Sequence, residues 1–379
     1  MTTIRSLYRL ARDLSVNLQI TPGRRQRWAR SLTDRIVMPD TCQTGHSPTN
    51  PETVEIGKWF RWGLGGSGTH ATLRGSETVP SGQTAFWLKW CPKLTAAEFD
   101  VSYRRMQCWR SLHPELADQV PPTIAYLADE QLILMEARPG RPLSTAWWEV
   151  ADRSHLKDQL ETTVMKIGAW LRDFGRGRDT YGSEITPLLG DHGRIDTAGH
   201  LRVDARHQIE CRILQAEQAA DQLARDGLSV ASQWADRFDL DAIVASFHND
   251  EPGGFMHGDM KPDNVLIDGD DFTVIDWWMT PSVSWPLPDA AIFATALTTQ
   301  APGPLGHALL TCFLDAYLQN GNEHNLQAMD LIGTIWLLCM TAVASRRGIV
   351  ARMLTRKESE QLVRRAVSQS VLAANQKAA

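Results

Sequence analysis

Residues 255–278 read FMHGDMKPDNVLIDGDDFTVIDWW, in which apolar, strand-like runs flank a polar loop. Asp259 and Asn264 lie in the loop, and Asp276 follows the last apolar run. Phosphoryl transfer needs such groups, because one Asp orients and deprotonates the attacking hydroxyl while Asn and a second Asp offer oxygen ligands to Mg²⁺. The pattern therefore predicts a phosphoryl-transfer centre. For residues 268–271 an acidic β-hairpin turn is the better interpretation.

The same stretch resembles the catalytic and metal-binding loops of the aminoglycoside phosphotransferase-like (choline kinase-like) family of the protein-kinase-like superfamily. The family signatures H-G-D-x-x-x-x-N and I-D-W both occur in it. The resemblance implies that Asp259 is the catalytic base and that Asn264 and Asp276 hold magnesium. It also implies that His257 supports the loop.

Lys261 lies two residues after Asp259, as in the H-R-D-x-K-P-x-N form of Ser/Thr protein kinases, where the lysine steadies the transferred phosphate. A solvated loop lysine is the alternative. Further along, Asp289 resembles an acid at a family helix start that braces the catalytic loop, and a plain helix N-cap is its alternative.

Residues 63–68, GLGGSG, contain a G-x-G-x-x-G motif between two strand-like runs. Glycines let the backbone N–H groups approach phosphate oxygens, because no Cβ intervenes. A dinucleotide-binding fold would place a helix next, but residues 69–73 indicate a second strand. The sequence also lacks the P-loop pattern G-x-x-x-x-G-K-[ST]. We therefore expect a kinase-type glycine loop that binds nucleotide through Gly63, Gly65, Gly66 and Gly68.

Lys89 is embedded in an apolar strand, residues 86–90, where a charge needs a partner. The resemblance assigns Lys89 to the nucleotide α- and β-phosphates and to a helix carboxylate. An edge-strand lysine that points to water is the alternative.

The helix carboxylate is the weakest part of the resemblance. The family glutamate would fall near Arg105, which is not an acid, so Glu98 is the candidate; a helix-dipole role at the helix start is its alternative. Residues 134–143 resemble the family's lobe linker. That likeness implies that backbone groups around Glu136 and Ala137 hold adenine.

Composition bears on whether the protein binds nucleic acid, in which compartment it lies and whether it spans a membrane. The 379 residues include 39 Lys and Arg and 44 Asp and Glu, and a net charge of −5 argues against nucleic-acid binding. Scattered cysteines with no C-x-x-C pair favour a reduced, cytoplasmic protein. The longest uncharged apolar stretch, residues 331–344, is too short to span a bilayer and predicts a buried helix. We expect no transmembrane segment.

The expected fold is α+β and bilobal, like that of protein kinases, with a small antiparallel-sheet N-lobe and a large, mainly helical C-lobe. Apolar periodicity predicts helices at residues 98–112, 156–171 and 209–223, and the Gly-, Asp- and Thr-rich residues 175–201 predict a surface loop. We assign residues 1–53 to a basic N-terminal extension, 54–140 to the nucleotide-binding lobe, and 141–379 to the helical lobe with the catalytic loop. Eight arginines and three aspartates give residues 1–50 a local charge of +5, so the extension either docks on an anionic partner or packs as helices.

The expected activity is ATP- and Mg²⁺-dependent phosphorylation of a hydroxyl group on an aminoglycoside, amino alcohol or saccharide. A Ser/Thr protein kinase remains an alternative because of Lys261, although no D-F-G or A-P-E motif follows residues 257–264. The second alternative is a catalytically silent, kinase-like scaffold. Residues 262–345 carry nine acids and no Lys or Arg, which suggests either a cationic acceptor or only metal binding and solvated loops. The sequence does not decide between ATP and GTP.

Overall fold

A computed structural model gives the fold. It describes residues 26–28, 31, 51–56, 60–62, 66–75, 85–91, 94–150, 154–189, 193–277, 282–318, 323–346, 361 and 363–364. The docking role predicted for the basic extension and the phosphate contacts of Gly63 and Gly65 lie outside these residues.

The chain divides into two compact units. Unit 1 comprises Met1–Gln107 and Val120–Arg138, and unit 2 comprises Cys108–Gln119 and Pro139–Ala379. Unit 1 carries the larger sheet, whereas unit 2 carries most of the helices. The sequence places the lobe boundary after residue 140, and the compact units separate after Arg138.

Unit 1 holds an antiparallel sheet in the order β1-β3-β4-β6-β5, with β2 paired to β3. Its core includes Leu88, Leu132 and Leu134, which are fully buried. The strand expected at residues 69–73 is confirmed within β3, so the dinucleotide-binding alternative is excluded. The strands are β1 (Pro51–Ile56), β2 (Phe60–Trp62), β3 (Gly66–Gly75), β4 (Ala85–Trp90), β5 (Thr123–Leu127) and β6 (Leu132–Glu136).

A long helix, α3 (Ala96–Leu112), follows β4 and confirms the helix expected at residues 98–112. Its last turn belongs to unit 2, as does the short 3₁₀ helix η2 (Pro114–Gln119). Trp109 on that last turn is fully buried and stacks on Trp277, with ring centroids 6.0 Å apart. The end of α3 therefore contributes to the aromatic core of unit 2.

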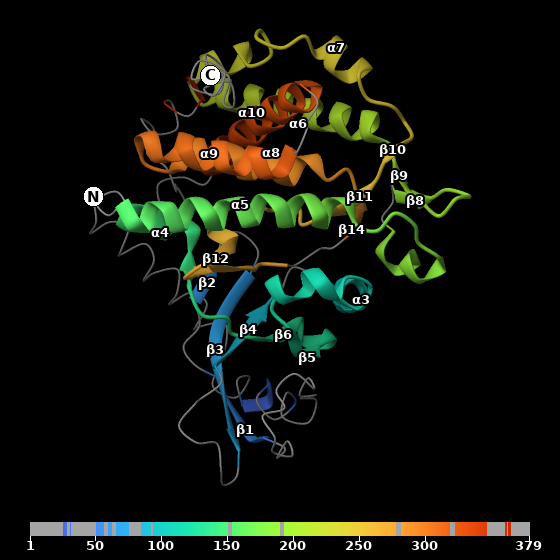
Figure 1. Ribbon diagram of the computed structural model, residues 1–379, viewed down its shortest axis with the longest axis vertical. Helices are drawn as coiled ribbons and strands as arrows, with labels where there is room; N and C mark the ends of the chain where they lie inside the picture. Colours follow the sequence, from blue (N-terminus) through green and yellow to red (C-terminus); the bar gives the residue numbers. More distant parts are fainter. Residues whose placement is uncertain are drawn as a thin grey trace. The chain divides into compact units, whose positions relative to one another are not determined.

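The helices of unit 2 pack in layers. Figure 1 shows α5 against α8 and α9, with α6 and α10 on the other side of that pair. Helix α8 is buried continuously from Leu287 to Thr298, because neighbours cover it all round and its sequence is rich in Ala. The helices expected at residues 156–171 and 209–223 are confirmed. The helices are α4 (Leu143–Val150), α5 (Ser154–Arg176), α6 (Ala205–Arg225), α7 (Leu240–Ala245), α8 (Leu287–Gln300), α9 (Gly303–Leu318) and α10 (Glu323–Arg346).

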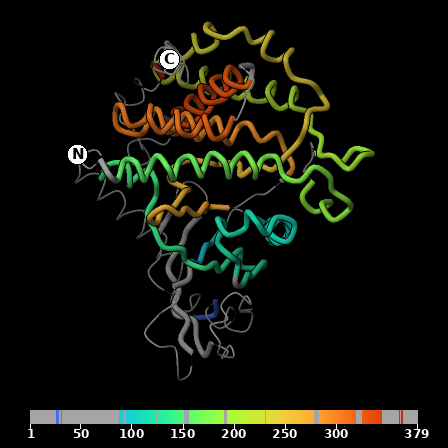
Figure 2. The backbone as a smooth tube through the Cα atoms, viewed as in Figure 1, coloured from blue at the N-terminus to red at the C-terminus, as the bar shows by residue number. Residues whose placement is uncertain are grey.

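The segments between these helices form three small sheets. β7 (Arg141–Pro142), β12 (Val265–Asp268) and β13 (Asp271–Val274) form one sheet, and Figure 2 shows residues near 141 beside the distant hairpin. The acidic turn expected at residues 268–271 is confirmed, since Asp268 pairs with Asp271. The other two sheets are β11–β14 and β8–β9–β10, built from β8 (Gly193–Ile195), β9 (Leu201–Val203), β10 (Glu251–Pro252), β11 (Gly254–Met256) and β14 (Ser282–Ser284).

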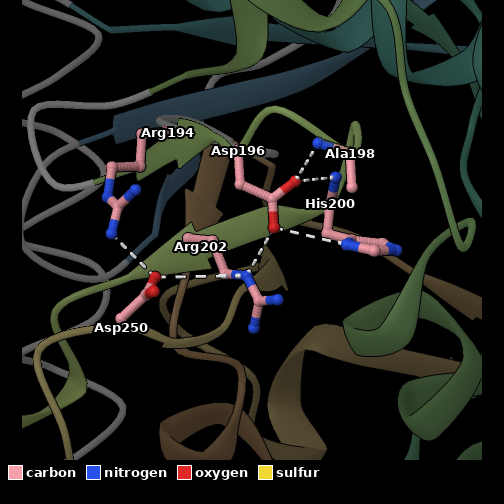
Figure 3. A network of polar contacts seen from close by, with 6 residues as sticks. All are labelled: Arg194, Asp196, Ala198, His200, Arg202 and Asp250. Atoms are coloured by element: carbon pink, nitrogen blue, oxygen red, sulfur yellow. Dashed lines mark hydrogen bonds and ion pairs between the residues drawn. The ribbon is translucent and has the colours of Figure 1, made fainter.

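The surface loop expected at residues 175–201 is partly wrong, because its end folds into the β8–β9 hairpin. Asp196 organises the turn of this hairpin (Figure 3). One carboxylate oxygen accepts from two backbone N–H groups of the turn, and the other accepts from Arg202 Nε at 2.9 Å. The bond from the His200 N–H and the bond from Arg202 hold the pKa of Asp196 well below its usual range. Polar side chains therefore stabilise a hairpin that has little apolar content.

Helix α10 contains the apolar stretch that the sequence predicts to be buried. By length and composition alone, Asn325–Val343 is long enough to span a membrane, with a mean hydropathy of 1.6. However, 67% of that window is buried inside the protein, and the core helix of a soluble protein passes the same test. The prediction of a buried helix is confirmed, whereas the prediction that this stretch is too short to span a bilayer is wrong.

Gly254 in β11 is the closest backbone contact between a strand and α5. A Cβ at this position would lie 1.4 Å from the Gly175 carbonyl oxygen, which is backbone and cannot rotate away. We expect Gly254→Ala to lower the free energy of unfolding by about 3 kcal/mol or more. Gly269→Ala is the control: its turn has open space, so only its left-handed backbone (φ +61°) costs about 1 kcal/mol. Urea unfolding measures both, and equal losses would contradict the contact.

Candidate active site

The polar loop predicted to be catalytic lies between β11 and β12. It runs through residues 257–261 and a short 3₁₀ helix, η6 (Pro262–Asn264). Gly258 has φ +85°, a left-handed conformation that glycine adopts without strain, and this turns the chain sharply before Asp259. The loop is thus a tight bend whose backbone N–H groups need acceptors from elsewhere.

Asp289 on α8 supplies those acceptors. Its carboxylate is fully buried and accepts from the backbone N–H groups of His257 and Gly258, the latter at 2.9 Å. The expectation that Asp289 braces the loop is confirmed, because its side chain bonds to the loop and does not cap α8. Burial raises the pKa of Asp289 to about 7, although the two N–H groups and the charge of Arg212 act in the opposite direction.

His257 connects the loop to the segment that carries Asp276. Its Nε2 lies 3.1 Å from the carbonyl oxygen of Ile275, and its Nδ1 accepts from the Asp259 N–H at 3.3 Å. Both bonds are satisfied by the tautomer that carries its proton on Nε2. The geometry therefore supports the structural role predicted for His257.

The carboxylate of Asp259 is held on one side. Lys261 Nζ lies 2.6 Å from Asp259 Oδ2, and Asn264 Nδ2 donates to the same oxygen at 3.1 Å. Asn264 Nδ2 also donates to the Asp259 carbonyl oxygen at 2.8 Å. Within the described residues, Asp259 Oδ1 and Asn264 Oδ1 receive no hydrogen bond. One oxygen on each side chain therefore remains available to a reactant or an ion.

Asp276 adopts a left-handed backbone, with φ +68°, which is rare for a residue other than glycine. Contacts on both sides of it impose this conformation. The Ile275 N–H donates to the Asn264 carbonyl oxygen at 2.8 Å, and the buried Trp277 indole donates to the Val274 carbonyl oxygen at 2.7 Å. The two residues predicted as metal ligands are therefore linked through the backbone.

The nucleotide-binding candidates of unit 1 meet in its sheet. Gly68 in β3 pairs directly with Lys89 in β4, and Gly66 lies two residues earlier at the start of β3. The Lys89 side chain is only 8% exposed. The alternative of a lysine that points to water from an edge strand does not fit, because β4 lies between β3 and β6.

The remaining candidates of unit 1 have other contacts. The exposed Glu98 carboxylate accepts from the Thr95 N–H and hydroxyl, a capping box that begins α3 and supports the helix-start alternative. The Glu136 N–H donates to the Pro122 carbonyl oxygen at 3.0 Å, so this N–H is not available to bind adenine. Ala137 follows β6, where the sequence places the lobe linker.

The sequence analysis missed Arg212 and Gln208, two polar residues on α6. Arg212 is half-buried, and its charge acts on Asp289. No motif marks these positions. The usable signal was the four-residue spacing of two polar side chains in a helix that is otherwise amphipathic.

A model of the phosphotransferase enzyme family known as APH matches residues 58–324. No curated protein matches the chain. Similar solved structures include an ADP-bound aminoglycoside phosphotransferase, 12% identical over 85% of this chain and 95% of that one, with a TM-score of 0.47. A glucosamine kinase is 11% identical over 89% and 97%, with a TM-score of 0.48. A Plasmodium vivax ethanolamine kinase is 11% identical over 85% and 83%, with a TM-score of 0.46.

Those identities are too low to indicate which acceptor this chain uses. The family match, by contrast, covers well over half of the sequence and includes the whole catalytic loop. The chain therefore belongs to this phosphotransferase enzyme family, and its fold is α+β, as its sequence predicts.

Proposed function

We propose that this protein uses ATP and Mg²⁺ to phosphorylate a hydroxyl group of a small molecule or sugar. The group transferred is the γ-phosphoryl group of ATP. The arrangement of Asp259 carries the proposal. Lys261 and Asn264 both bind its Oδ2, which leaves Oδ1 to take a proton from the acceptor. Such a fixed carboxylate suits a general base, because its orientation costs nothing at the moment of reaction.

The proposed step is an in-line displacement. The acceptor oxygen forms a bond to the γ-phosphorus while the bond from that phosphorus to the β–γ bridging oxygen breaks, and ADP leaves. The acceptor proton passes to Asp259 Oδ1. Lys261, whose Nζ already lies beside the carboxylate, stabilises the negative charge of the transferred group. Lys89 and the backbone N–H groups near Gly66 and Gly68 bind the nucleotide phosphates.

The residues present fit magnesium. Both side-chain hydrogen bonds of Asn264 use Nδ2, so its carbonyl oxygen is available, and Asp276 adds a carboxylate. Among described residues, no three His, Cys, Asp or Glu side chains converge on a metal site. This agrees with Mg²⁺ chemistry, because that ion is commonly bound by one or two carboxylates together with nucleotide phosphates. When bound, the ion would neutralise phosphate charge.

A protein acceptor is the second candidate because Lys261 contacts Asp259, as the Ser/Thr kinase pattern requires. The residue after Asp276 favours a small acceptor. It is Trp277, whose buried ring packs on His257 at 4.3 Å between centroids, in place of the Phe-Gly of D-F-G. An assay panel of aminoglycosides, amino alcohols, sugars and Ser/Thr peptides distinguishes the two.

Asp259→Asn tests the base. We expect kcat to fall by about 10²- to 10⁴-fold, with folding and Mg·ATP affinity retained, because only the proton acceptor is lost. Asp270→Asn removes the same charge from the exposed β12–β13 turn and should leave kcat within about threefold. Steady-state turnover of the best acceptor in the panel measures both, and undiminished turnover by Asp259→Asn would refute the assignment.

Asp276→Asn tests the metal ligand. Asn tolerates the left-handed backbone, so the change removes the charge without adding strain. In the presence of Mg²⁺, calorimetry should show that the variant binds ATP about tenfold or more weakly than the wild-type protein. Even the loss of a residue that only supports a metal ligand weakens metal binding by about that much. ATP binding in EDTA should be almost the same in both proteins. A similar loss with and without Mg²⁺ would contradict the role.

Asp289→Asn tests how the loop is positioned. The amide keeps one acceptor oxygen but turns an NH₂ group towards a backbone N–H donor, so one of the two loop bonds is lost. We expect kcat to fall by about tenfold or more, with little change in the KM for Mg·ATP. A rise in KM with kcat unchanged would show that Asp289 does not position the base.

The same variant has a pH signature. The folded pKa of Asp289, about 7, lies above the ordinary value of 3.8 for an aspartate, so the folded protein retains a proton that the unfolded chain has released. This contribution to the free energy of unfolding is fully present below about pH 4 and is lost as the pH rises through about 7. Relative to Asp289→Asn, the wild-type protein should therefore become less stable between pH 4 and 7. A constant difference in urea unfolding across that range would contradict the shift.

A further inference from the structure

Two polar side chains on one face of α6 lack the partners that their burial requires. Gln208 and Arg212 are four residues apart, so they are neighbours on the helix surface. The Gln208 amide nitrogen is buried and has no hydrogen-bond partner, whereas its Oε1 accepts from the Ser284 hydroxyl at 3.0 Å. A buried, unpaired N–H donor costs about 1–3 kcal/mol, so it needs an acceptor that the polypeptide does not provide.

Arg212 is in the same situation. It is half-buried, burial lowers the pKa of its guanidinium, and within the described part of the chain it makes no hydrogen bond or ion pair. Other shielded arginines of unit 2 are paired: Arg237 binds Asp330 at 2.7 Å, and Arg202 binds Asp196 at 2.9 Å. A guanidinium presents a planar fork of donors that matches a carboxylate or a phosphate group.

Both side chains lie on the catalytic-loop side of unit 2. Ser284, which binds Gln208, pairs with Gly254 on β11, and β11 leads directly into the loop. Asp289, which holds that loop, is influenced by the charges of both Arg212 and Asp259. An anion held by Arg212 would therefore lie near the loop that Asp289 holds.

Apart from Asp276, the proposed metal ligand, six of the acidic residues between 262 and 345 are bound to other groups or exposed to solvent. Asp289 binds backbone N–H groups, Asp330 binds Arg237, and Asp263 accepts from Ser144. Three more lie on the β12–β13 hairpin, exposed to solvent: Asp268, Asp270 and Asp271. Apart from the carboxylates of the proposed base and metal site, Arg212 is therefore a charge near the loop to which the described residues give no hydrogen bond or ion pair.

We propose that the hydroxyl acceptor carries an anionic group, a carboxylate or a phosphate, that binds to Arg212 and Gln208. This inference rests on the proposed function and specifies its substrate class. The anionic group takes no part in bond making; it holds the acceptor so that its hydroxyl reaches Asp259, which receives the proton. Binding the anion gives both unpaired donors the acceptor that they lack.

The test uses acceptors that differ only in charge. One series is glycerol, D-glycerate, glycerol 3-phosphate and 3-amino-1,2-propanediol; the other is glucose, glucuronate, glucose 6-phosphate and glucosamine. We expect the wild-type protein to show a kcat/KM about tenfold or more higher for an anionic member than for its neutral and cationic counterparts. The carboxylate and phosphate members distinguish the two anions.

Variants of α6 test whether Arg212 causes the preference for anionic acceptors. Arg212→Gln should raise KM for the anionic acceptors by about tenfold or more and leave kcat and the neutral acceptors almost unchanged, and Arg212→Lys should restore part of the loss. Arg206→Gln on the same helix is the control, because Arg206 is exposed and pairs with Glu210. If Arg212→Gln does not fold, Gln208→Met gives the same readout, since replacing an unpaired buried amide by an apolar group of similar size is nearly neutral for stability.

A direct binding measurement keeps the inference separate from the proposed function. Calorimetry with D-glycerate, glucuronate and inorganic phosphate should show binding to the full chain that Arg212→Gln weakens and Arg206→Gln does not. Equal use of charged and neutral acceptors, or a kcat loss for every acceptor in Arg212→Gln, would overturn the inference while Asp259-dependent transfer stands. If no acceptor is phosphorylated, the proposed function fails, and anion binding that does not depend on Arg212 then overturns the inference as well.

Discussion

The loop that carries Asp259 and Asn264 depends on one buried carboxylate. Asp289 accepts the N–H groups of His257 and Gly258, which the sharp, left-handed bend at Gly258 turns away from any strand partner. Without this carboxylate the two N–H groups would lose their acceptor, and an unpaired buried N–H costs about 1–3 kcal/mol. Helix α8, buried almost along its whole length, thus fixes the loop to the centre of unit 2. The positions of Asp259 and Asn264 follow from that attachment.

The aromatic core positions the second half of the site in a similar way. Trp277 packs on His257 and stacks on Trp109 from the last turn of α3, so the residue after Asp276 cannot move independently of the loop. The strained backbone of Asp276 is held by this packing and by the bond from Ile275 to Asn264. Strain that the surroundings maintain is common where a side chain must point in one direction for function.

The sequence predicted the elements well where a short pattern determines them. The acidic turn of residues 268–271, the strand at 69–73 and the brace at Asp289 each follow from local chemistry or a motif. It did not predict that Lys89 pairs with Gly68, because register depends on a turn length that the pattern leaves open. Nor did it predict Gln208 and Arg212, since an unpaired side chain is recognised only when all its neighbours are known.

The distribution of charge in unit 2 carries this argument one step further. A run of nine acids suggests a negative site, yet charge acts locally, and those acids whose contacts are described are bound elsewhere or lie in solvent. Arg212 acts on Asp289, and Asp289 holds the loop that carries Asp259. A ligand that neutralises Arg212 would therefore also remove a charge that lowers the pKa of Asp289. If the proposed anionic acceptor binds there, its charge would favour the protonated form of Asp289.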